Sequence, residues 1–585
     1  MPRIPRSRPL ATALLALIAG LAPTRGEEPR RPEALLLIDG GSRLLVANRG
    51  TGTVAVVDAK GRRVEEEVAI GRGLSDLRAT ADPDVWLAVD QEAGEVVRIV
   101  RRGGTIARLD AVRVADDPTR AVVHGDGRRA MVVSRWSRRA TFVEWGATDA
   151  LCAVAAVDLP FSPREAAVLP GGSEAVATDA FGGRLALVDL DAMVVRRVLT
   201  LPDHNLRAPT ITPDGLGVAI LAQNGVPRAN TSRQDVEWGL VMRSWIRVVR
   251  LDDLRSPGAT DADLVANSRI IVLGTVGKGS ADPSALAFGP RGEAVVSMAG
   301  TDQVASALAL GEPYERFSVG RAPVALAIDA EAATAYTADR FDDALTVVDL
   351  TAGKLAGVVA LSAAAGIDGR RRPATLLEEG ESLFRDARVS EDGWMSCHTC
   401  HADGHASDVL TDTMTDGSYG AAKRSPSLLG IADTAPFGWT GASRRLQDQI
   451  HTSITTTMRG HEPAPRQIEA LAAYLRSLDP PRPEPVADAD AVARGRAIFE
   501  SNGCADCHAP PAYTTRGSYD VGLVDAVGNR EFNPPSLRGV GRRPALLHDA
   551  SVMSLPDLFR QARHPDGGEL TDAEIADLAS FLRSL

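Results

Sequence analysis

Four of the five cysteines in this 585-residue chain form two pairs of the same spacing, and a histidine directly follows each pair. The motifs are Cys397-His-Thr-Cys400-His401 and Cys504-Ala-Asp-Cys507-His508. A Cys-x-x-Cys pair alone is typical of a redox disulfide or of half a zinc site. The adjacent histidine favours haem c, because thioether bonds to both haem vinyl groups leave that imidazole beside the iron. Zinc would need further thiolates or histidines from elsewhere in the chain, so we expect two covalently bound haem c groups with His401 and His508 as axial ligands.

Helical patterns surround both motifs. Amphipathic segments precede them at 380–396 and 489–503, and further helices follow at 466–481 and 570–585. In the first of the following helices, apolar residues recur at i, i+3 and i+7, which is the spacing of one buried helix face. The pattern predicts two tandem cytochrome c-like units, at 370–480 and 488–585, with the proline-rich segment 481–487 as linker.

A different pattern repeats through residues 34–362. Seven copies of an apolar strand, a polar turn and a second strand have their first-strand cores at 46, 88, 131, 175, 217, 294 and 334. Most steps between these positions are 40–44 residues, the length of one four-stranded propeller blade. The one longer step holds either an insertion at about 225–260 or an eighth blade. The copies resemble YVTN-type β-propellers, which implies a fold but no activity. Cys152 lies in an apolar run of this region, and we expect it to be buried.

Residues 1–26 have the features of a secretory signal peptide, because three arginines precede an apolar run from Leu10 to Ala22. The alternative is a membrane anchor, but this run is shorter than the roughly 20 residues that a spanning helix needs. We therefore predict a periplasmic or otherwise exported protein without a stable membrane span. A net charge of −11, with no long Lys/Arg-rich run, argues against a nucleic-acid partner.

Five segments recur in a fixed order around the two Cys-x-x-Cys-His motifs: GESLFRDARVSEDGWMSCHTCH, KRSPSLLG, FGWTGAS, RRLQDQI and PPSLRGVGRRPALLHDAS. In these segments, about 210 residues of the chain resemble the bacterial di-haem cytochrome c peroxidases and the related di-haem tryptophan-modifying enzymes. The resemblance implies a peroxidatic first haem and a low-spin second haem that transfers electrons. The expected fold class is multidomain: an all-β seven-bladed propeller followed by a mainly α tandem di-haem cytochrome c domain.

The same resemblance implies roles around the first haem. Trp439 matches a tryptophan between the two haems that relays electrons, although a packing role is the alternative. Gln449 matches a glutamine of the distal pocket. The family's catalytic glutamate lies ten residues further on, where this chain has Arg459, or Thr457 in an alignment anchored on its neighbour Met458. Neither is a carboxylate acid–base group, although Arg459 could polarise a bound peroxide and Glu462 lies three residues beyond it.

Axial ligands opposite the two proximal histidines are less defined by the sequence. For the second haem, the family's ligand lies just before a Gly-Gly pair, which places His564 there with Met553 as the alternative; a surface histidine is the other interpretation of His564. Two histidine ligands would lower the potential relative to a His/Met pair. For the first haem the candidates, none of which has a diagnostic spacing, are His405, His451, Met458 and His461.

A calcium ion between the haems is also implied by the family, through an Asn and a Thr. The matching positions here are Ser425 and either Arg542 or Arg543, and an arginine disfavours a cation site. 

Three hypotheses on function follow. The first is a peroxide-dependent oxidoreductase that receives electrons from a small donor protein, a cytochrome or a cupredoxin. The second is an electron-relay cytochrome whose propeller docks a partner. The third is a quinone-linked dehydrogenase, for which no residue here places a quinone.

Overall fold

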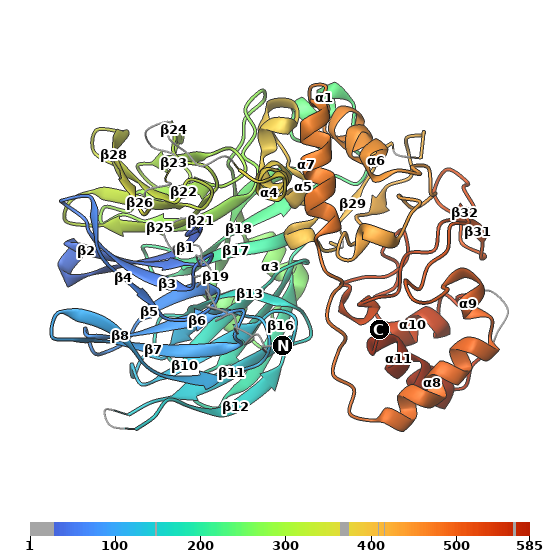
Figure 1. Cartoon of the computed structure of the whole chain (residues 1–585), viewed down its shortest axis with the longest axis horizontal. Helices are drawn as coiled ribbons and strands as arrows, with labels where there is room; N and C mark the ends of the chain where they lie inside the picture. The colour runs from blue at the N-terminus through green and yellow to red at the C-terminus, as the bar shows by residue number, and fades with distance from the viewer. Residues whose placement is uncertain are drawn as a thin grey trace, which may run out of the picture.

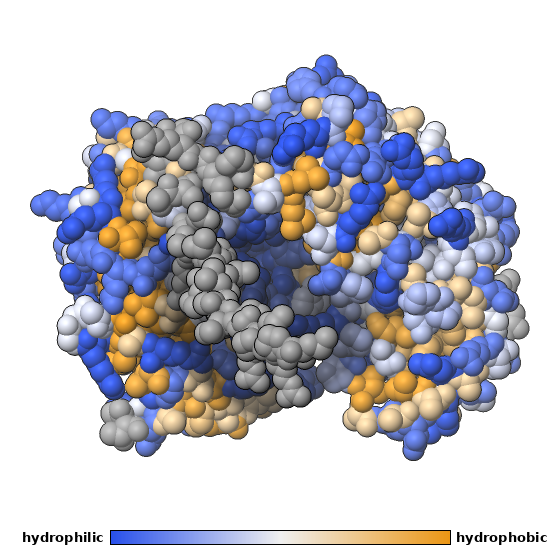
Figure 2. Space-filling model, viewed as in Figure 1, coloured by the Kyte–Doolittle hydropathy of each residue, from blue (hydrophilic) through white to orange (hydrophobic). Residues whose placement is uncertain are grey.

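The structure is a computed structural model that describes residues 28–146, 149–362, 365, 374–407, 409–414, 416–565 and 569–585. The predicted signal peptide lies outside the described residues, as do Gly567 and Gly568. Figure 1 shows a strand-rich part beside a mainly helical part. In Figure 2, hydrophilic residues surround a hollow between these two parts. No helix in the described part of the chain has both the length and the apolar character needed to cross a membrane.

The strand-rich part is a seven-bladed β-propeller. Each blade is a four-stranded antiparallel sheet in which consecutive strands are neighbours. The first strands of adjacent blades pack side by side, and β1 (Pro32–Ile38) of the first blade also packs against β25 (Pro323–Asp329) of the last, which closes the ring. Seven sheets account for the described strands from 32 to 360, so the long repeat step contains no eighth blade.

The remaining strands follow in chain order. Blades one to three contain β2 (Arg43–Asn48), β3 (Thr53–Asp58), β4 (Arg63–Ala69), β5 (Leu74–Ala79), β6 (Val85–Asp90), β7 (Glu95–Arg102), β8 (Thr105–Arg113), β9 (Pro118–Val123), β10 (Arg129–Ser134), β11 (Arg139–Glu144) and β12 (Cys152–Asp158). Blades four to seven contain β13 (Pro163–Val168), β14 (Glu174–Asp179), β15 (Arg184–Asp189), β16 (Val194–Thr200), β17 (His204–Ile211), β18 (Gly217–Asn224), β19 (Arg243–Arg250), β20 (Arg269–Val272), β21 (Pro283–Phe288), β22 (Ala294–Met298), β23 (Gln303–Ala307), β24 (Glu315–Ser318), β26 (Thr334–Asp339), β27 (Ala344–Asp349) and β28 (Lys354–Ala360).

The middle strands are apolar on both faces because each face packs against a neighbouring blade. In β2, Leu44 and Val46 join a cluster with Tyr336 of blade seven, whereas Leu45 and Ala47 join one that extends into blade two. Successive side chains of a strand point to opposite faces, so one strand contributes to two inter-blade cores. This explains the nearly continuous hydrophobic runs of the sequence repeats.

The fifth blade carries its additional residues in two places rather than in one insertion at about 225–260. Residues 225–242 separate β18 from β19 and include the helix α1 (Arg233–Glu237). Two more helices, α2 (Leu251–Arg255) and α3 (Asp261–Asn267), separate β19 from β20 and bury Leu251, Leu254 and Leu264 in the adjacent core. The additional residues of this blade therefore lie partly before and partly after its third strand, β19.

Cys152 is exposed, contrary to the prediction that it is buried. It begins β12, the fourth strand of its blade, which is an edge strand with mostly exposed side chains. An apolar run in such a strand lies on the surface because no further strand covers its outer edge.

The helical part begins with α4 (Leu376–Arg385), the haem-motif helix α5 (Cys397–Cys400) and α6 (Leu446–Thr452), which continues as one π-helical segment, Ser453–Thr457. Then follow α7 (Pro465–Arg476), α8 (Ala489–Ser501), the second haem-motif helix α9 (Cys504–Cys507), α10 (Leu555–Arg560) and α11 (Asp572–Arg583). Two short hairpins, β29 (Leu410–Thr411) with β30 (Lys423–Arg424) and β31 (Tyr519–Asp520) with β32 (Glu531–Phe532), complete the regular structure, together with short 3-10 turns at Asp39–Gly41, Ala387–Val389, Glu391–Gly393, Ala402–Gly404, Ile431–Asp433 and Val540–Arg542.

The two halves of the helical part repeat one helix crossing. α4 packs on α7, and α8 packs on α11. At each crossing a glycine allows the backbones to touch: a Cβ on Gly380 would lie 2.0 Å from the Ala470 carbonyl oxygen, and a Cβ on Gly495 would lie 2.0 Å from that of Asp577. No side chain fits in either place, so the close approach depends on glycine. The crossings hold α5 and α9 in equivalent positions.

Polar and aromatic contacts dock the first helical unit onto the propeller. The Asp403 carboxylate pairs with Arg164 at 2.6 Å and with Arg135 at 2.5 Å, both from the propeller. The Trp394 indole donates to the Glu237 carbonyl at 3.0 Å. The second unit, with α8 to α11, lies farther from the blades than α4 and α5 do (Figure 1). The propeller therefore contacts mainly the region of the first Cys-x-x-Cys-His motif.

Candidate functional site

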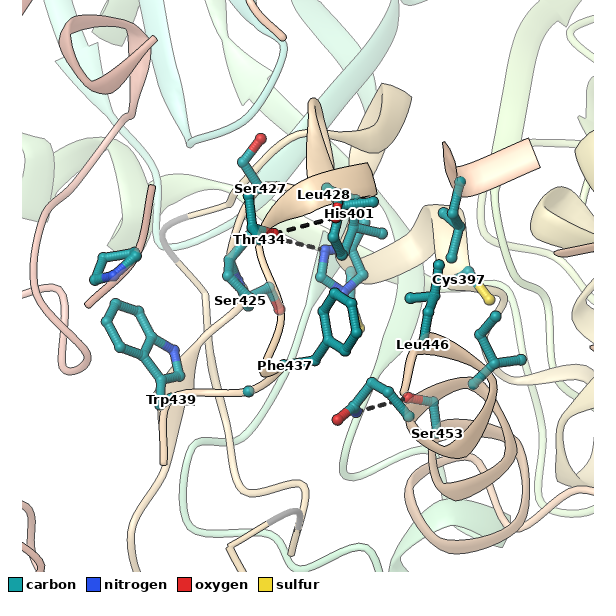
Figure 3. Close-up of a pocket in the computed structure, with 18 of the residues that line it drawn as sticks. Cys397, His401, Ser425, Ser427, Leu428, Thr434, Phe437, Trp439, Leu446 and Ser453 are labelled. Atoms are coloured by element: carbon teal, nitrogen blue, oxygen red, sulfur yellow. Dashed lines mark hydrogen bonds between the residues drawn. The ribbon is translucent and has the colours of Figure 1, made fainter. Parts of the chain in front are cut away.

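A cavity of about 240 Å³ adjoins the first Cys-x-x-Cys-His motif. The short helix α5 begins at the N-cap Ser396, whose hydroxyl accepts from the Thr399 amide, and ends at His401. One turn of helix therefore places Cys397, Cys400 and His401 in the same wall of the cavity. In Figure 3, Cys397 and Trp439 lie on opposite sides of His401.

His401 is oriented by its backbone partner. Its Nδ1 lies 2.9 Å from the Pro426 carbonyl oxygen, so Nδ1 carries the proton and donates it. Burial lowers the pKa of His401 to about 4, which keeps the imidazole neutral. The unprotonated Nε2 then presents its free electron pair to the cavity, as a metal ligand must.

The donor set fits haem c better than zinc. Burial raises the pKa of both Cys397 and Cys400 to about 12. A structural zinc site takes four protein ligands, whereas the motif offers two thiols and one imidazole. No cluster of three or more histidine, cysteine or acidic side chains suited to a metal ion occurs in the described part of the chain. Two thiols beside one neutral imidazole, facing an apolar cavity, match thioether attachment with one axial nitrogen.

The second motif adjoins a smaller, mainly apolar cavity of about 170 Å³, with Cys504, Cys507 and His508 in its wall. His508 Nδ1 lies 3.2 Å from the Tyr513 carbonyl oxygen, which leaves Nε2 for a metal as in the first cavity. Burial lowers the pKa of His508 to about 4. The two cavities thus present the same local arrangement of thiols and imidazole.

His564 lines the second cavity as well, opposite the motif. Its ring centroid lies 6.5 Å from that of His508, with 73° between the planes. A histidine nitrogen binds a transition metal at about 2.0 Å, so two imidazoles on opposite sides of one ion have centroids about 6 Å apart. His564 Nδ1 is buried without a hydrogen-bond partner, and burial lowers the pKa of this side chain. Met553 is exposed and does not line the cavity, so the structure favours His564.

Apart from the motif, the first cavity is lined by uncharged polar groups and by the cations Lys423, Arg424, Arg538 and Arg543. Gln449 lines it, and its Nε2 donates to the Ser453 hydroxyl at 3.3 Å. Thr457 and Met458 line it too. No aspartate or glutamate is among the described residues that line this cavity. The sequence has no carboxylate at the position of the family's glutamate, and no other described lining residue supplies one.

Arg459 does not reach the cavity, contrary to its predicted role. The π-helical segment Ser453–Thr457 shifts the register of the residues after it, and Arg459 has a left-handed φ of 53°. Its guanidinium group instead donates to the Thr231 carbonyl of the propeller insertion and, at 2.9 Å, to the Tyr419 hydroxyl. Thr457, the alternative in the sequence alignment, is the residue that faces the cavity.

Three of the four distal candidates for the first haem lie elsewhere. His405 is fully buried against Trp136 and Phe181 of the propeller, and its ring nitrogens lie 3.0 Å from the Ser427 hydroxyl and 3.2 Å from the Arg542 carbonyl oxygen. The other two histidines do not line the cavity; His451 pairs with Glu462 at 2.9 Å on the surface and His461 is exposed. Met458, buried and facing the cavity, is the candidate that remains.

Trp439 lies between the two cavities and lines both. Its indole donates to the Arg424 carbonyl at 2.7 Å, and the Arg424 guanidinium group lies 5.4 Å from the ring centroid. Arg543 also lines both cavities, and burial lowers its pKa to about 10. Arg424 lies in the KRSPSLLG segment but has no role predicted from the sequence, and Arg543 is one of two arginines that match a calcium-ligand position of the family.

The residues that match the family's calcium ligands make different contacts in this structure. Ser425 lines the first cavity. Arg542 donates to the carbonyls of Arg482 and Pro483, at 2.7 and 3.0 Å, and so fixes the segment between the two units. Arg543, which lines both cavities, presents a guanidinium group where a calcium site would need an oxygen ligand.

Comparisons with known proteins agree with this geometry. Residues 375–479 match the family model of di-haem cytochrome c peroxidase, and residues 492–585 match that of cytochrome c. Over these residues the helical part is similar to the di-haem cytochrome c peroxidases and to cytochrome c. It is 26% identical to methylamine utilization protein MauG of Methylophilus methylotrophus over 270 residues, which covers 35% of this chain and 81% of that protein.

Another curated relative and a solved structure are also similar to this chain. Cytochrome c551 peroxidase of Nitrosomonas europaea is 21% identical over 268 residues, covering 36% of this chain and 80% of that protein. Among solved structures, hydrazine synthase of Kuenenia stuttgartiensis superposes with a TM-score of 0.47 and 18% identity, covering 55% of this chain and 96% of that one. The sequence matches support an oxidoreductase function for the di-haem cytochrome region.

Proposed function

We propose that the protein is an exported di-haem c-type cytochrome that reduces hydrogen peroxide at its first haem, with electrons that arrive through the second. Cys397 and Cys400 would bind one haem covalently, and Cys504 and Cys507 the other. The Leu10–Ala22 apolar run supports export to the periplasm, where haem c proteins and a cytochrome or cupredoxin donor would meet.

The unequal donors of the two cavities carry this proposal. Two imidazoles face each other across the second cavity, whereas His401 is the one histidine among the described residues that line the first. A haem with one permanent protein ligand supplies an exchangeable coordination position and one-electron redox chemistry. The first cavity is therefore suited to peroxide and the second to electron transfer.

The residues opposite His401 have the chemistry to hold peroxide. The Gln449 amide donates, and the hydroxyl groups of Ser453 and Thr457 both donate and accept. Reduction of one hydrogen peroxide to two waters takes two electrons and two protons. Because no described lining residue is a carboxylate, the protons would move through these hydroxyl groups, through water or from the Lys423 ammonium group, which also lines the cavity. Trp439, in contact with both cavities, is placed to relay the electrons.

Reoxidation by peroxide tests the proposal directly. Fully reduced holoprotein is mixed with substoichiometric hydrogen peroxide and followed by absorbance. We expect two haems to be oxidised for each peroxide consumed, in a reaction that saturates with peroxide. Oxidation no faster than that of a cytochrome c with two permanent axial ligands would contradict the peroxidase.

Gln449→Leu should lower the rate of reoxidation by peroxide roughly 100-fold, the scale of losing one preorganised hydrogen-bond donor at a reacting oxygen. Haem content and spectra should not change, because Gln449 would not bind either iron. Gln447→Leu is the matched control, since Gln447 is on the same helix and contacts Glu469 outside the cavity. Equal rates in the two variants would remove Gln449 from the reaction.

The electron-relay alternative has one specific observation in its favour. Met458 is buried in the first cavity, and a methionine thioether is a common sixth ligand of cytochrome c haems. Met458→Leu preserves side-chain volume and should cost less than about 1.5 kcal/mol. Our proposal predicts an unchanged spin state of the oxidised first haem. A change from low spin to high spin would identify Met458 as a permanent ligand and favour the relay.

A further inference from the structure

A third cavity is larger than the two haem-motif cavities and is separate from both. It has a volume of about 580 Å³ and lies on the propeller axis. The inner strands of all seven blades line it, through Glu33, Ser75, Arg120, Glu165, Arg207, Ser284 and Val324. The first helical unit lines it at one end, through Glu381 and Arg385 of α4, His398 of α5, Asp403 and Tyr474. We call this space the axial chamber.

The axial chamber is strongly charged. Nine arginines and eight aspartates or glutamates line it, and most form ion pairs with each other. Arg340 pairs with Glu33, Arg120 with Glu165 at 2.9 Å, and Asp403 with several arginines. Such walls exclude apolar ligands and favour a charged or polar occupant.

Arg207 differs from these paired arginines. No carboxylate lies within ion-pair distance of its guanidinium group in the described part of the chain; its Nε donates to the Asn205 side chain at 3.1 Å, and its Nη2 lies 3.3 Å from His398 Nε2. Burial, and then the neighbouring Arg164 cation, lower its pKa to about 9, which still leaves it charged at neutral pH. An arginine fork without an anionic partner, in a polar chamber of this volume, is suited to an oxyanion from solution.

Arg207 is joined to the first haem motif through a short chain of contacts. His398 is the residue directly after Cys397, and its side chain faces the chamber while His401 faces the haem cavity. Asp282 of the propeller accepts from Thr399 at 3.1 Å and from Ser396, and lies 3.4 Å from His398. The helix α5 is therefore a wall shared by the axial chamber and the first haem cavity.

From this arrangement we propose that the axial chamber binds a small oxyanion, a carboxylate or a phosphate, on Arg207, and that the first haem senses its binding. An anion there adds negative charge one helix away from the iron, in a region of low dielectric. Negative charge stabilises the more positive, oxidised haem, so binding lowers the potential of the first haem. Binding itself does not depend on the peroxide chemistry proposed above.

Calorimetry and a redox titration on the holoprotein test this proposal, with acetate, succinate and inorganic phosphate as separate probes in a chloride buffer. We expect at least one probe to bind and to lower the potential of the first haem while the second is unchanged. Arg207→Gln should weaken binding roughly tenfold to hundredfold, the scale of losing hydrogen bonds to a charged group. The three probes distinguish carboxylate from phosphate recognition.

Arg250→Gln is the matched control, because Arg250 is in the same blade, pairs loosely with Asp252 at 3.6 Å and lies outside the chamber. Arg207→Lys keeps the charge and should retain part of the affinity, which guards against misfolding of the glutamine variant. The proposal is overturned if no probe binds, if Arg207→Gln and Arg250→Gln weaken binding equally, or if binding leaves the first haem's potential unchanged.

Discussion

We expect His564→Ala to convert the second haem from low spin to high spin while the haem stays attached through Cys504 and Cys507. His564 faces His508 across the second cavity, and Met553, the alternative ligand, is exposed outside it. His548 is the one other histidine among the described residues that line this cavity, and its ring packs on Phe532. We therefore expect water to take the coordination position that His564 leaves. Electron delivery should fall by at least the roughly tenfold to hundredfold that losing a supporting group costs a metal site.

Electron paramagnetic resonance and peroxide turnover measure both effects. His451→Ala is the control, because His451 is a surface histidine paired with Glu462 outside both cavities. An unaltered low-spin signal in His564→Ala would remove His564 as a ligand. Loss of haem from the purified variant would instead assign His564 a role in maturation and contradict the prediction of intact attachment.

Asp403→Asn should destabilise the docked structure by about 3–5 kcal/mol, the usual cost of removing one partner from a buried ion pair. Burial alone would raise the pKa of Asp403, but Arg164, Arg135 and the hydrogen bond from His398 hold it well below its usual range. Without the carboxylate, several guanidinium groups share a buried space without their counter-ion. Asparagine tolerates the left-handed φ of 50° at this position, so backbone strain does not contribute.

Denaturant unfolding of the holoprotein measures this change. Asp433→Asn is the matched control, because Asp433 also pairs with an arginine, Arg538, but is about half exposed. Exposed pairs of this kind contribute about 0–1 kcal/mol. If Asp403→Asn were no more destabilising than Asp433→Asn, the Asp403 cluster would not hold the helical part on the propeller.

Local patterns in the sequence carried most of the fold. The 40–44-residue steps predict blades because each blade is one repeating unit, and the Cys-x-x-Cys-His motifs need only one helical turn to place their ligands. His564 lines its cavity as the sequence analysis expected, and Gln449 and Trp439 face the cavities. Their roles in catalysis stay predictions until tested.

The errors arose where a distant or irregular element decides a position. Arg459 misses the cavity because a π-helical segment changes the register that ungapped alignment assumes. His405 packs against Trp136 and Phe181 of the propeller, which lie more than 200 residues earlier in the chain, and so it does not line the first cavity. The axial chamber is assembled from dispersed residues of seven blades and of the first helical unit, so no local pattern in the sequence reveals it.

The central claim is that the first haem has an exchangeable position and the second has two histidine ligands. Electron paramagnetic resonance of the oxidised, mature holoprotein, before and after addition of hydrogen peroxide, tests it most directly. We predict one high-spin and one low-spin signal, with peroxide altering the high-spin signal first. Two low-spin signals that do not respond to peroxide would contradict the account and establish an electron relay.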